Sequence, residues 1–230
     1  REVPSMTIPA IRPYRLPAAE ELPPNVVDWQ PSPGRCALLI HDMQQHFVRA
    51  FPADAEPITE VLANITALRR RCVELGIPVI FTAQPAAQDP RARGLLCDFW
   101  GPGPADEAAI AIVPALAPVP GDRVLTKHRY SAFVGTDLSG LLGGLGRDQL
   151  LICGVYAHIG CVVTACDAFM RDIQPFLVAD ALGDFTRSEH TAALSYAARR
   201  CAAVLTTGQA LDQFGVVGAA RPVGGHRGRS

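Results

Sequence analysis

Six short, continuous apolar runs most constrain what this chain of 230 residues can fold into. Such runs, interrupted by polar, Gly or Pro residues, are typical of strands that are covered on both faces. They occupy residues 36–41, 77–83, 123–126, 149–153, 176–179 and 202–206.

Helical patterns lie between these runs. Apolar residues from Ile58 to Cys72 recur three and four positions apart, and Gly76 and Pro78 end that helix. Residues 164–172 and 188–200 follow a similar pattern. Strand and helix therefore alternate, which predicts an α/β fold with parallel strands and a ligand site beyond their carboxyl ends.

The two ends of the chain differ from this central region. Residues 1–35 are rich in proline, which excludes regular helix and central strand and predicts an extended arm on the domain or toward a partner. Residues 36–214 form the predicted domain. Residues 215–230 are rich in Gly, Ala and Arg and are predicted to be disordered.

Composition excludes several classes of function. The net charge is −1, which gives no bulk attraction to nucleic acid or to an anionic membrane. No apolar run approaches the roughly 20 residues that span a bilayer, and no signal peptide is evident, so a cytoplasmic protein is expected. The seven cysteines are scattered, mostly within apolar runs, and lack zinc-site spacing, which predicts free thiols and no bound metal.

The segment 154–161, with sequence GVYAHIGC, predicts an active-site corner. It reads as the end of a buried strand, a tight glycine turn, and a helix that begins at Cys161. A helix N-terminus favours a thiolate and offers N–H donors to a negative oxygen. His158 in this turn is either a general base or a structural histidine.

Two other strand ends are predicted to aim side chains at the same edge of the sheet. Asp42 follows the first strand and Lys127 follows the third. Taken alone, Asp42 is equally well a helix cap and Lys127 a solvated loop residue. Because Cys161 lies at this edge too, we interpret the three as one site. Gln84, Arg93 and Trp100 follow the second strand, and they suit a small anionic ring through a guanidinium and an indole.

The chain resembles the isochorismatase family of the cysteine-hydrolase superfamily from about residue 8 to residue 212. The resemblance lies in HDMQQHF at 41–47, TAQP at 82–85, RGLLCDFWGPG at 93–103, KHRYSAF at 127–133 and GVYAHIGC at 154–161, with further matches at 167–185 and 195–207. It implies a Rossmann-like fold of three layers, with a six-stranded, mainly parallel sheet and helices on both faces. His128 departs from the pattern, since the family has Trp there.

The resemblance also implies an activity. Members cleave the vinyl ether of isochorismate or of 2-amino-2-deoxyisochorismate, release pyruvate, use no cofactor or metal, and serve siderophore or phenazine-type biosynthesis. A homodimer without a fused carrier domain is expected here. The implied catalytic residues are Asp42 and Lys127, with Cys161 as a possible third, and the implied substrate contacts are Phe47, Gln84, Arg93, Trp100, Tyr130, Tyr156 and Gly160.

Vinyl-ether cleavage requires a general acid, a role that the resemblance gives to Asp42. Burial beside an anionic substrate favours the protonated carboxyl group, whereas a neighbouring Lys127 favours the ionised one. An alternative is a cysteine amidohydrolase in which Cys161 attacks a carbonyl group. The histidine ligands of metal-dependent nicotinamidases have no counterpart in residues 82–89, which favours the ether hydrolase. A third possibility is a non-enzymatic scaffold that docks a carrier protein.

Overall fold

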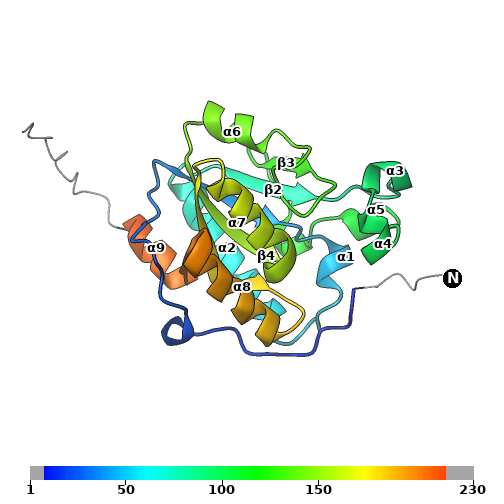
Figure 1. The fold of residues 1–230 in the computed structure, drawn as a ribbon, viewed down its shortest axis with the longest axis horizontal. Helices are drawn as coiled ribbons and strands as arrows, with labels where there is room; N and C mark the ends of the chain where they lie inside the picture. The colour runs from blue at the N-terminus through cyan, green and yellow to red at the C-terminus, as the bar shows by residue number, and fades with distance from the viewer. Residues whose placement is uncertain (1–7, 216–230) are drawn as a thin grey trace, which may run out of the picture.

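The computed structural model describes residues 8–215. Its centre is a six-stranded sheet in which every pair of neighbouring strands is parallel, in the order β3-β2-β1-β4-β5-β6 (Figure 1). The expected mainly parallel sheet is therefore parallel throughout. The strands are β1 Cys36–His41, β2 Val79–Ala83, β3 Arg123–Thr126, β4 Gln149–Val155, β5 Gln174–Gly183 and β6 Ala203–Leu205.

Helices connect the strands and cover both faces of the sheet. The α-helices are α1 Gln45–Val48, α2 Ile58–Glu74, α3 Pro90–Arg93, α4 Leu96–Trp100, α5 Glu107–Ile110, α6 Leu138–Gly144, α7 Val162–Phe169, α8 Arg187–Arg200 and α9 Thr207–Gly215. Shorter turns are the 3-10 helices η1 Ala19–Glu21 and η2 Pro114–Leu116, and the π-helical turn η3 Ala157–Cys161. No helix within residues 8–215 combines the length and the apolar character needed to cross a bilayer.

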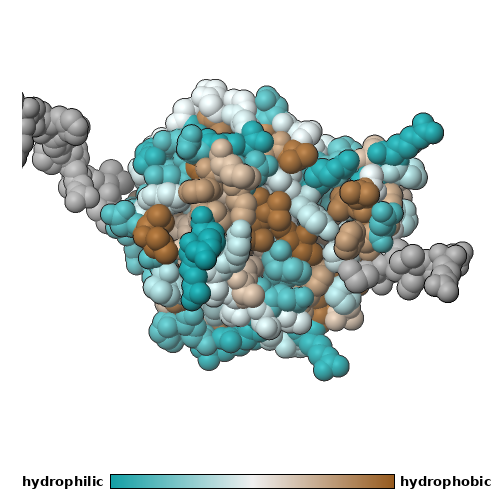
Figure 2. Space-filling model, in the orientation of Figure 1, coloured by the Kyte–Doolittle hydropathy of each residue, from teal (hydrophilic) through white to brown (hydrophobic). Residues whose placement is uncertain are grey.

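Alternating side chains of the strands build two separate hydrophobic cores. On one face, Leu38 and Ile40 of β1 pack in a cluster with α2 and α9. On the other face, Ala37 and Leu39 pack in a cluster with α6, α7 and α8. Figure 1 shows α7 and α8 in front of the sheet and α2 behind it. The outer surface of this front face mixes apolar and polar patches (Figure 2). The sheet is thus the middle of three layers, as predicted.

The described part of the proline-rich arm lies on the domain, which is one of the two placements predicted for it; the other was an arm that reaches toward a partner. Ile11 and Leu16 are buried in the core cluster of α2 and α9. The Asn25 side chain bonds to the backbone N and O of Val204, which fastens the arm to the edge strand β6. Figure 1 shows the arm in blue along one side of the molecule. Disorder was predicted for residues 215–230, and residues 216–230 lie outside the part of the chain that the structure describes.

Candidate active site

The site lies at the centre of the sheet, where the chain order reverses. β1 and β4 are neighbours, and connections from them lead to opposite sides of the sheet, which opens a crevice at their carboxyl ends. A cavity of about 470 Å³ lies there. Its lining contains the basic side chains Arg49, Arg93 and Lys127 and one carboxylate, that of Asp42. Such a balance suits an anionic ligand.

The cavity brings together nearly all residues that the sequence singled out. Of the ten residues with an implied catalytic or substrate-binding role, nine line it, namely Asp42, Phe47, Gln84, Arg93, Trp100, Lys127, Tyr130, Tyr156 and Gly160. Cys161 is fully buried and does not belong to the described lining. Their positions therefore agree with the sequence interpretation, while their roles stay predictions.

Asp42 is held by the strand beside its own. Its backbone has φ of 51°, in the left-handed region that Asp tolerates better than most residues. The Thr82 hydroxyl of β2 donates to Asp42 Oδ1 at 2.7 Å, and the backbone N–H of Asp42 donates to Thr82 Oγ1 at 3.2 Å. These two bonds fix the carboxylate, so that Oδ2 is the oxygen left for other contacts.

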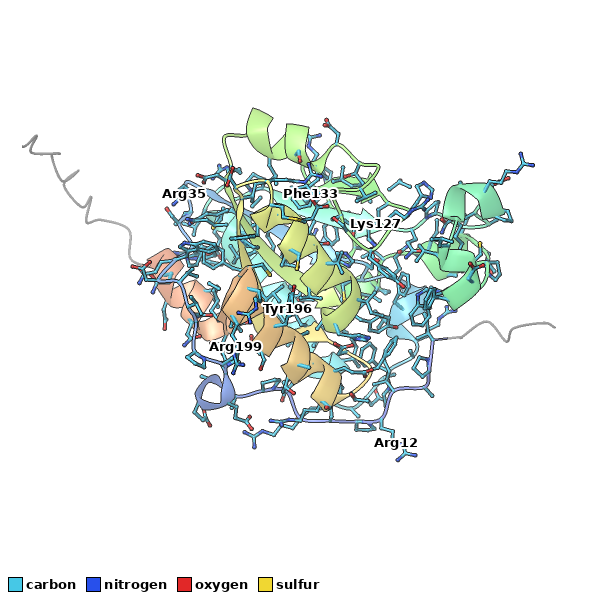
Figure 3. All side chains as sticks on the ribbon, in the orientation of Figure 1. Arg12, Arg35, Lys127, Phe133, Tyr196 and Arg199 are labelled. Carbon is cyan, nitrogen blue, oxygen red and sulfur yellow. The ribbon has the colours of Figure 1, made fainter. Side chains whose placement is uncertain are left out.

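Lys127 forms a buried ion pair with that oxygen. Its Nζ lies 2.7 Å from Asp42 Oδ2 and donates to the Arg129 carbonyl at 2.9 Å, and its side chain is 1% exposed. Figure 3 shows Lys127 between the sheet and the segment that carries α3 and α4. An ammonium has three donors, and within residues 8–215 only these two protein acceptors engage it. The third N–H is available to a ligand in the cavity.

His41 and Gly160 form the floor beneath this pair. His41 Nδ1 lies 2.9 Å from the Val155 carbonyl and 3.6 Å from Asp42 Oδ2. Burial lowers the pKa of His41. A Cβ atom on Gly160 would approach His41 Cε1 to 2.2 Å, so only glycine lets the turn pass this close to the ring.

A second polar part of the cavity lining is built around Arg93. Its NH1 donates to Gln84 Oε1 at 3.0 Å and its Nε donates to the Gly101 carbonyl at 2.6 Å. Burial lowers the pKa of Arg93. NH2 makes no hydrogen bond to a described residue, so the guanidinium keeps donors for an anion.

Aromatic side chains complete the walls. The Trp100 indole N–H donates to the Tyr130 hydroxyl at 2.7 Å, which ties two predicted contacts together. The Tyr156 hydroxyl donates to the Phe47 carbonyl at 2.8 Å, so Tyr156 offers mainly its ring to the cavity. Phe185 packs against Tyr156 with ring centroids 4.5 Å apart. These rings suit a flat, unsaturated ligand.

The surroundings of Cys161 do not favour the thiolate that a helix start there suggested. A π-helical turn, η3, stands where a tight glycine turn was predicted, and Cys161 is its last residue. The helix α7 begins one residue after Cys161 and not at it. Burial raises the pKa of the Cys161 thiol well above its usual range, and the nearby Asp42 carboxylate raises it further. Desolvation therefore outweighs any stabilisation of the anion by helical N–H groups.

His158 lies outside the cavity lining and pairs with a buried carboxylate. Its Nδ1 and its backbone N both donate to Asp184, and Phe185 N donates to Asp184 as well. Burial lowers the pKa of His158, but the hydrogen bond and charge of Asp184 outweigh this effect and raise it. Of the two roles considered for His158, the structural one fits this arrangement.

One group of possible metal ligands, which the spacing of the sequence does not reveal, comes together in the fold. Ligand atoms of His158, Asp184 and Glu189 lie within 4.8 Å of one another. However, both Asp184 oxygens already accept protein N–H groups, so a cation there would have to replace these bonds. The group is better described as a satisfied ion pair, and independence from metal stays a prediction.

Several residues of the cavity were not predicted from the sequence. His46 and Arg49 of the first connection line it, as do Ile8 of the arm and Phe185 after β5. Burial lowers the pKa of His46, and the charge of Arg93 lowers it further. His46 belongs to the same strand-end segment as Asp42, which was a usable signal. Ile8 and Phe185 lie far from the other site residues in the sequence and gave no such signal.

Comparison with known proteins agrees with this geometry. The family model described as Isochorismatase domain matches residues 36–209. The chain is 55% identical over 213 residues to the isochorismatase of Bacillus subtilis, covering 91% of this chain and 67% of that protein. It is 49% identical to the phenazine biosynthesis protein PhzD of Pseudomonas fluorescens, covering 87% of this chain and 96% of that protein. It is also 49% identical to enterobactin synthase component B of Escherichia coli, covering 90% of this chain and 73% of that protein.

Solved structures share the fold. A cysteine hydrolase from Pseudomonas syringae superposes with a TM-score of 0.74 at 21% identity, covering 84% of this chain and 98% of that one. An isochorismatase family protein from Burkholderia thailandensis superposes with a TM-score of 0.70 at 26% identity, covering 81% of this chain and 98% of that one. With the domain match and the curated relatives, these findings show that the chain belongs to the isochorismatase family.

Proposed function

We propose that this hydrolase cleaves the vinyl ether of isochorismate or of 2-amino-2-deoxyisochorismate, in siderophore or phenazine-type biosynthesis. The observation that carries the proposal is the Asp42 carboxylate, held 2.7 Å from the Lys127 ammonium inside a cavity that also presents Arg93. It places a proton-transfer group beside a site for an anion. The names of the relatives in isochorismate, phenazine and enterobactin chemistry point to the same substrates.

The proposed reaction begins with proton transfer to carbon. Asp42 delivers its proton to the terminal methylene carbon of the enolpyruvyl group, and the ether oxygen shares its electron pair to form an oxocarbenium ion. Water adds to the cationic carbon and returns one proton to Asp42. The hemiketal then collapses, the bond between that carbon and the ring oxygen breaks, and pyruvate and the ring alcohol leave. The enzyme ends as it began.

The Asp42–Lys127 pair serves two stages of this reaction. Once Asp42 has given up its proton, its carboxylate lies beside the new cation and stabilises it electrostatically. Lys127 contacts Asp42 Oδ2, so it orients the carboxyl group and directs a remaining N–H to the substrate. A substrate carboxylate bound at Arg93 and Lys127 would lie close to Asp42 and repel a second negative charge there.

Pyruvate release tests the proposed function. The purified protein is incubated separately with isochorismate and with 2-amino-2-deoxyisochorismate, and pyruvate is followed with lactate dehydrogenase. Turnover of at least one compound is expected, and the ratio of the two kcat/KM values identifies the preferred substituent at ring position 2. If neither compound releases pyruvate, the proposed function is overturned.

Removing the Arg93 guanidinium should weaken substrate binding more than it slows chemistry. Arg93→Ala loses a charge-assisted pair that exists both before and during the reaction, so KM is expected to rise by about ten- to a hundredfold. The kcat value is expected to fall by less. Steady-state pyruvate assays give both constants. An unchanged KM would remove Arg93 from the set of substrate contacts.

The runner-up, an amidohydrolase with a Cys161 nucleophile, predicts the opposite response of one variant. Cys161 is fully buried and the pKa of its thiol is raised, which disfavours a nucleophilic role. Vinyl-ether cleavage also offers no acyl carbon for sulfur to attack. Cys161→Ala is therefore expected to keep most of the pyruvate-releasing activity, with losses due to packing alone.

Alkylation provides an independent check on Cys161. Iodoacetamide is expected to leave the native enzyme active, because the thiol is buried. Abolished turnover in Cys161→Ala, together with inactivation of the native enzyme that substrate prevents, would favour the amidase chemistry instead. A homodimer, a cytoplasmic location, and an activity that survives chelators stay predictions.

A further inference from the structure

A chain of hydrogen bonds runs from the rim of the site to its anion-binding side. Arg93 NH1 donates to Gln84 Oε1 at 3.0 Å. Gln88 Nε2 reaches the same oxygen at 3.4 Å. Beyond it, Gln88 Oε1 lies 3.0 Å from His128 Nδ1. Gln84, Gln88 and Arg93 are buried, whereas His128 is half-buried. The chain therefore links a peripheral histidine to a residue that lines the cavity.

The direction of each bond follows from the chemistry of arginine. A guanidinium has only donors, so the Gln84 atom that faces Arg93 must be its oxygen. The Gln88 atom next to that oxygen must then be its nitrogen, and Gln88 presents its own oxygen to His128. Consequently His128 carries a proton on Nδ1.

Gln84 is left with its amino group for the cavity. Gln84 Nε2 has no acceptor among residues 8–215, and it is absent from the fully buried unpartnered atoms of those residues. Since Gln84 lines the cavity, its two N–H donors face the ligand space. If the carboxamide turned over, three nitrogen donors would face one another.

We propose that His128 and Gln88 are positioning residues that hold the Gln84 carboxamide with its NH2 toward the substrate. Gln84 then recognises an acceptor without protons, such as a carboxylate or an ether oxygen. The inference rests on the proposed function for the identity of the substrate.

Gln88 matters most when the substrate is bound. An anion bound at the free NH2 donors of Arg93 shares the charge of the guanidinium and so weakens its bond to Gln84 Oε1, which fixes the carboxamide in the free enzyme. Gln88 Nε2 is the other donor to this oxygen, and His128 keeps Gln88 from turning over.

The test uses neutral variants of similar size. Gln88→Met and His128→Leu each break the chain, while His128→Asn retains a donor close to the position of Nδ1. KM and kcat are measured for pyruvate release from isochorismate, and the dissociation constant of 2,3-dihydroxybenzoate is measured by calorimetry. Gln88→Met and His128→Leu are expected to raise KM and the dissociation constant by about three- to tenfold, the size of one hydrogen bond, with kcat within twofold. His128→Asn is expected to recover most of the affinity.

A second background separates positioning from a purely structural role. In Gln84→Met the chain of hydrogen bonds has no carboxamide left to orient. Adding Gln88→Met or His128→Leu to this variant is therefore expected to change neither KM nor the dissociation constant further. Thermal unfolding of each variant confirms that it is folded. Equal losses in the wild-type and Gln84→Met backgrounds, or no loss in either single variant, would overturn the inference. Equal losses in His128→Leu and His128→Asn would overturn the part concerning His128.

The two readouts distinguish this inference from the proposed function. If the wild-type protein releases no pyruvate, the proposed function fails, while the same pattern in 2,3-dihydroxybenzoate binding still supports the inference. If turnover is present but neither KM nor the dissociation constant depends on Gln88, the inference fails and the proposed function stands. A wild-type protein that releases no pyruvate from isochorismate or from 2-amino-2-deoxyisochorismate, and that does not bind the probe, overturns both.

Discussion

Asp42→Asn should lower kcat by about 10²- to 10⁴-fold, the usual contribution of a general acid. The amide keeps the shape of the carboxyl group and can still accept from Thr82, which donates to Oδ1 in the native protein. It has no acidic proton to give to the methylene carbon, so the first step loses its donor. Steady-state release of pyruvate from isochorismate measures the loss.

Binding and a matched variant control this result. Asp42→Asn should still bind 2,3-dihydroxybenzoate, because Arg93 and Gln84 are untouched. Asp148→Asn serves as the matched control. Asp148 directly precedes β4, at the amino ends of the strands and so away from the site, and it pairs with Arg35 on the surface. Exposed pairs of this kind contribute little, so native turnover is expected there. Near-native turnover in Asp42→Asn would remove Asp42 from the mechanism.

Lys127→Met should destabilise the protein as well as impair it. The side chains of Lys127 and Asp42 are 1% and 7% exposed, so removal of the ammonium leaves a carboxylate buried without its partner. Loss of one member of a buried pair costs about 3–5 kcal/mol of unfolding free energy. Urea unfolding measures this cost, and pyruvate release is expected to fall together with it.

A double variant tests whether the cost comes from the stranded charge. Asp42→Asn combined with Lys127→Met removes both charges, so it should be more stable than Lys127→Met alone. Its activity should stay as low as that of Asp42→Asn, because the proton donor is missing in both. A double variant with the summed losses in stability of the two single variants would show that the two residues do not act as a pair.

The sequence predicted the fold well because buried parallel strands appear as continuous apolar runs. The runs at 36–41 and 123–126 coincide with β1 and β3. β5 extends from Gln174 to Gly183, well beyond the predicted 176–179. The prediction stopped at residue 179 because Asp180 interrupts the apolar pattern. The fold satisfies Asp180 through the backbone N and hydroxyl of Thr207, a contact that no local pattern reveals.

The prediction of a tight turn at Gly154 is wrong. The sequence suggested that a turn starts there, whereas Gly154 is still in β4, with φ of 110°. A Cβ atom on it would lie 2.2 Å from the His41 carbonyl oxygen, so the residue is glycine because β1 passes very close. Such an approach depends on tertiary structure and cannot be predicted from composition or spacing.

The site was predictable where it depends on strand ends and not where it depends on distant segments. Asp42 and Lys127 directly follow strands, and the sheet brings them together. The contact between Gln88 and His128 joins two loops 40 residues apart and could not be predicted. The state of Cys161 could not be predicted either, because its burial depends on the packing of the whole second core.

The enclosure of Cys161 decides which compounds can inhibit this protein. An electrophilic reagent needs a thiolate within reach, and Cys161 is fully buried with its thiol held in the protonated form. Reagents that alkylate a nucleophilic cysteine at this position in enzymes of the same fold are therefore expected not to react with Cys161. A reversible compound that pairs a carboxylate for Arg93 with a positive centre beside Asp42 would instead imitate the charges of the proposed transition state, and its inhibition would distinguish ether hydrolysis from cysteine chemistry on the same fold.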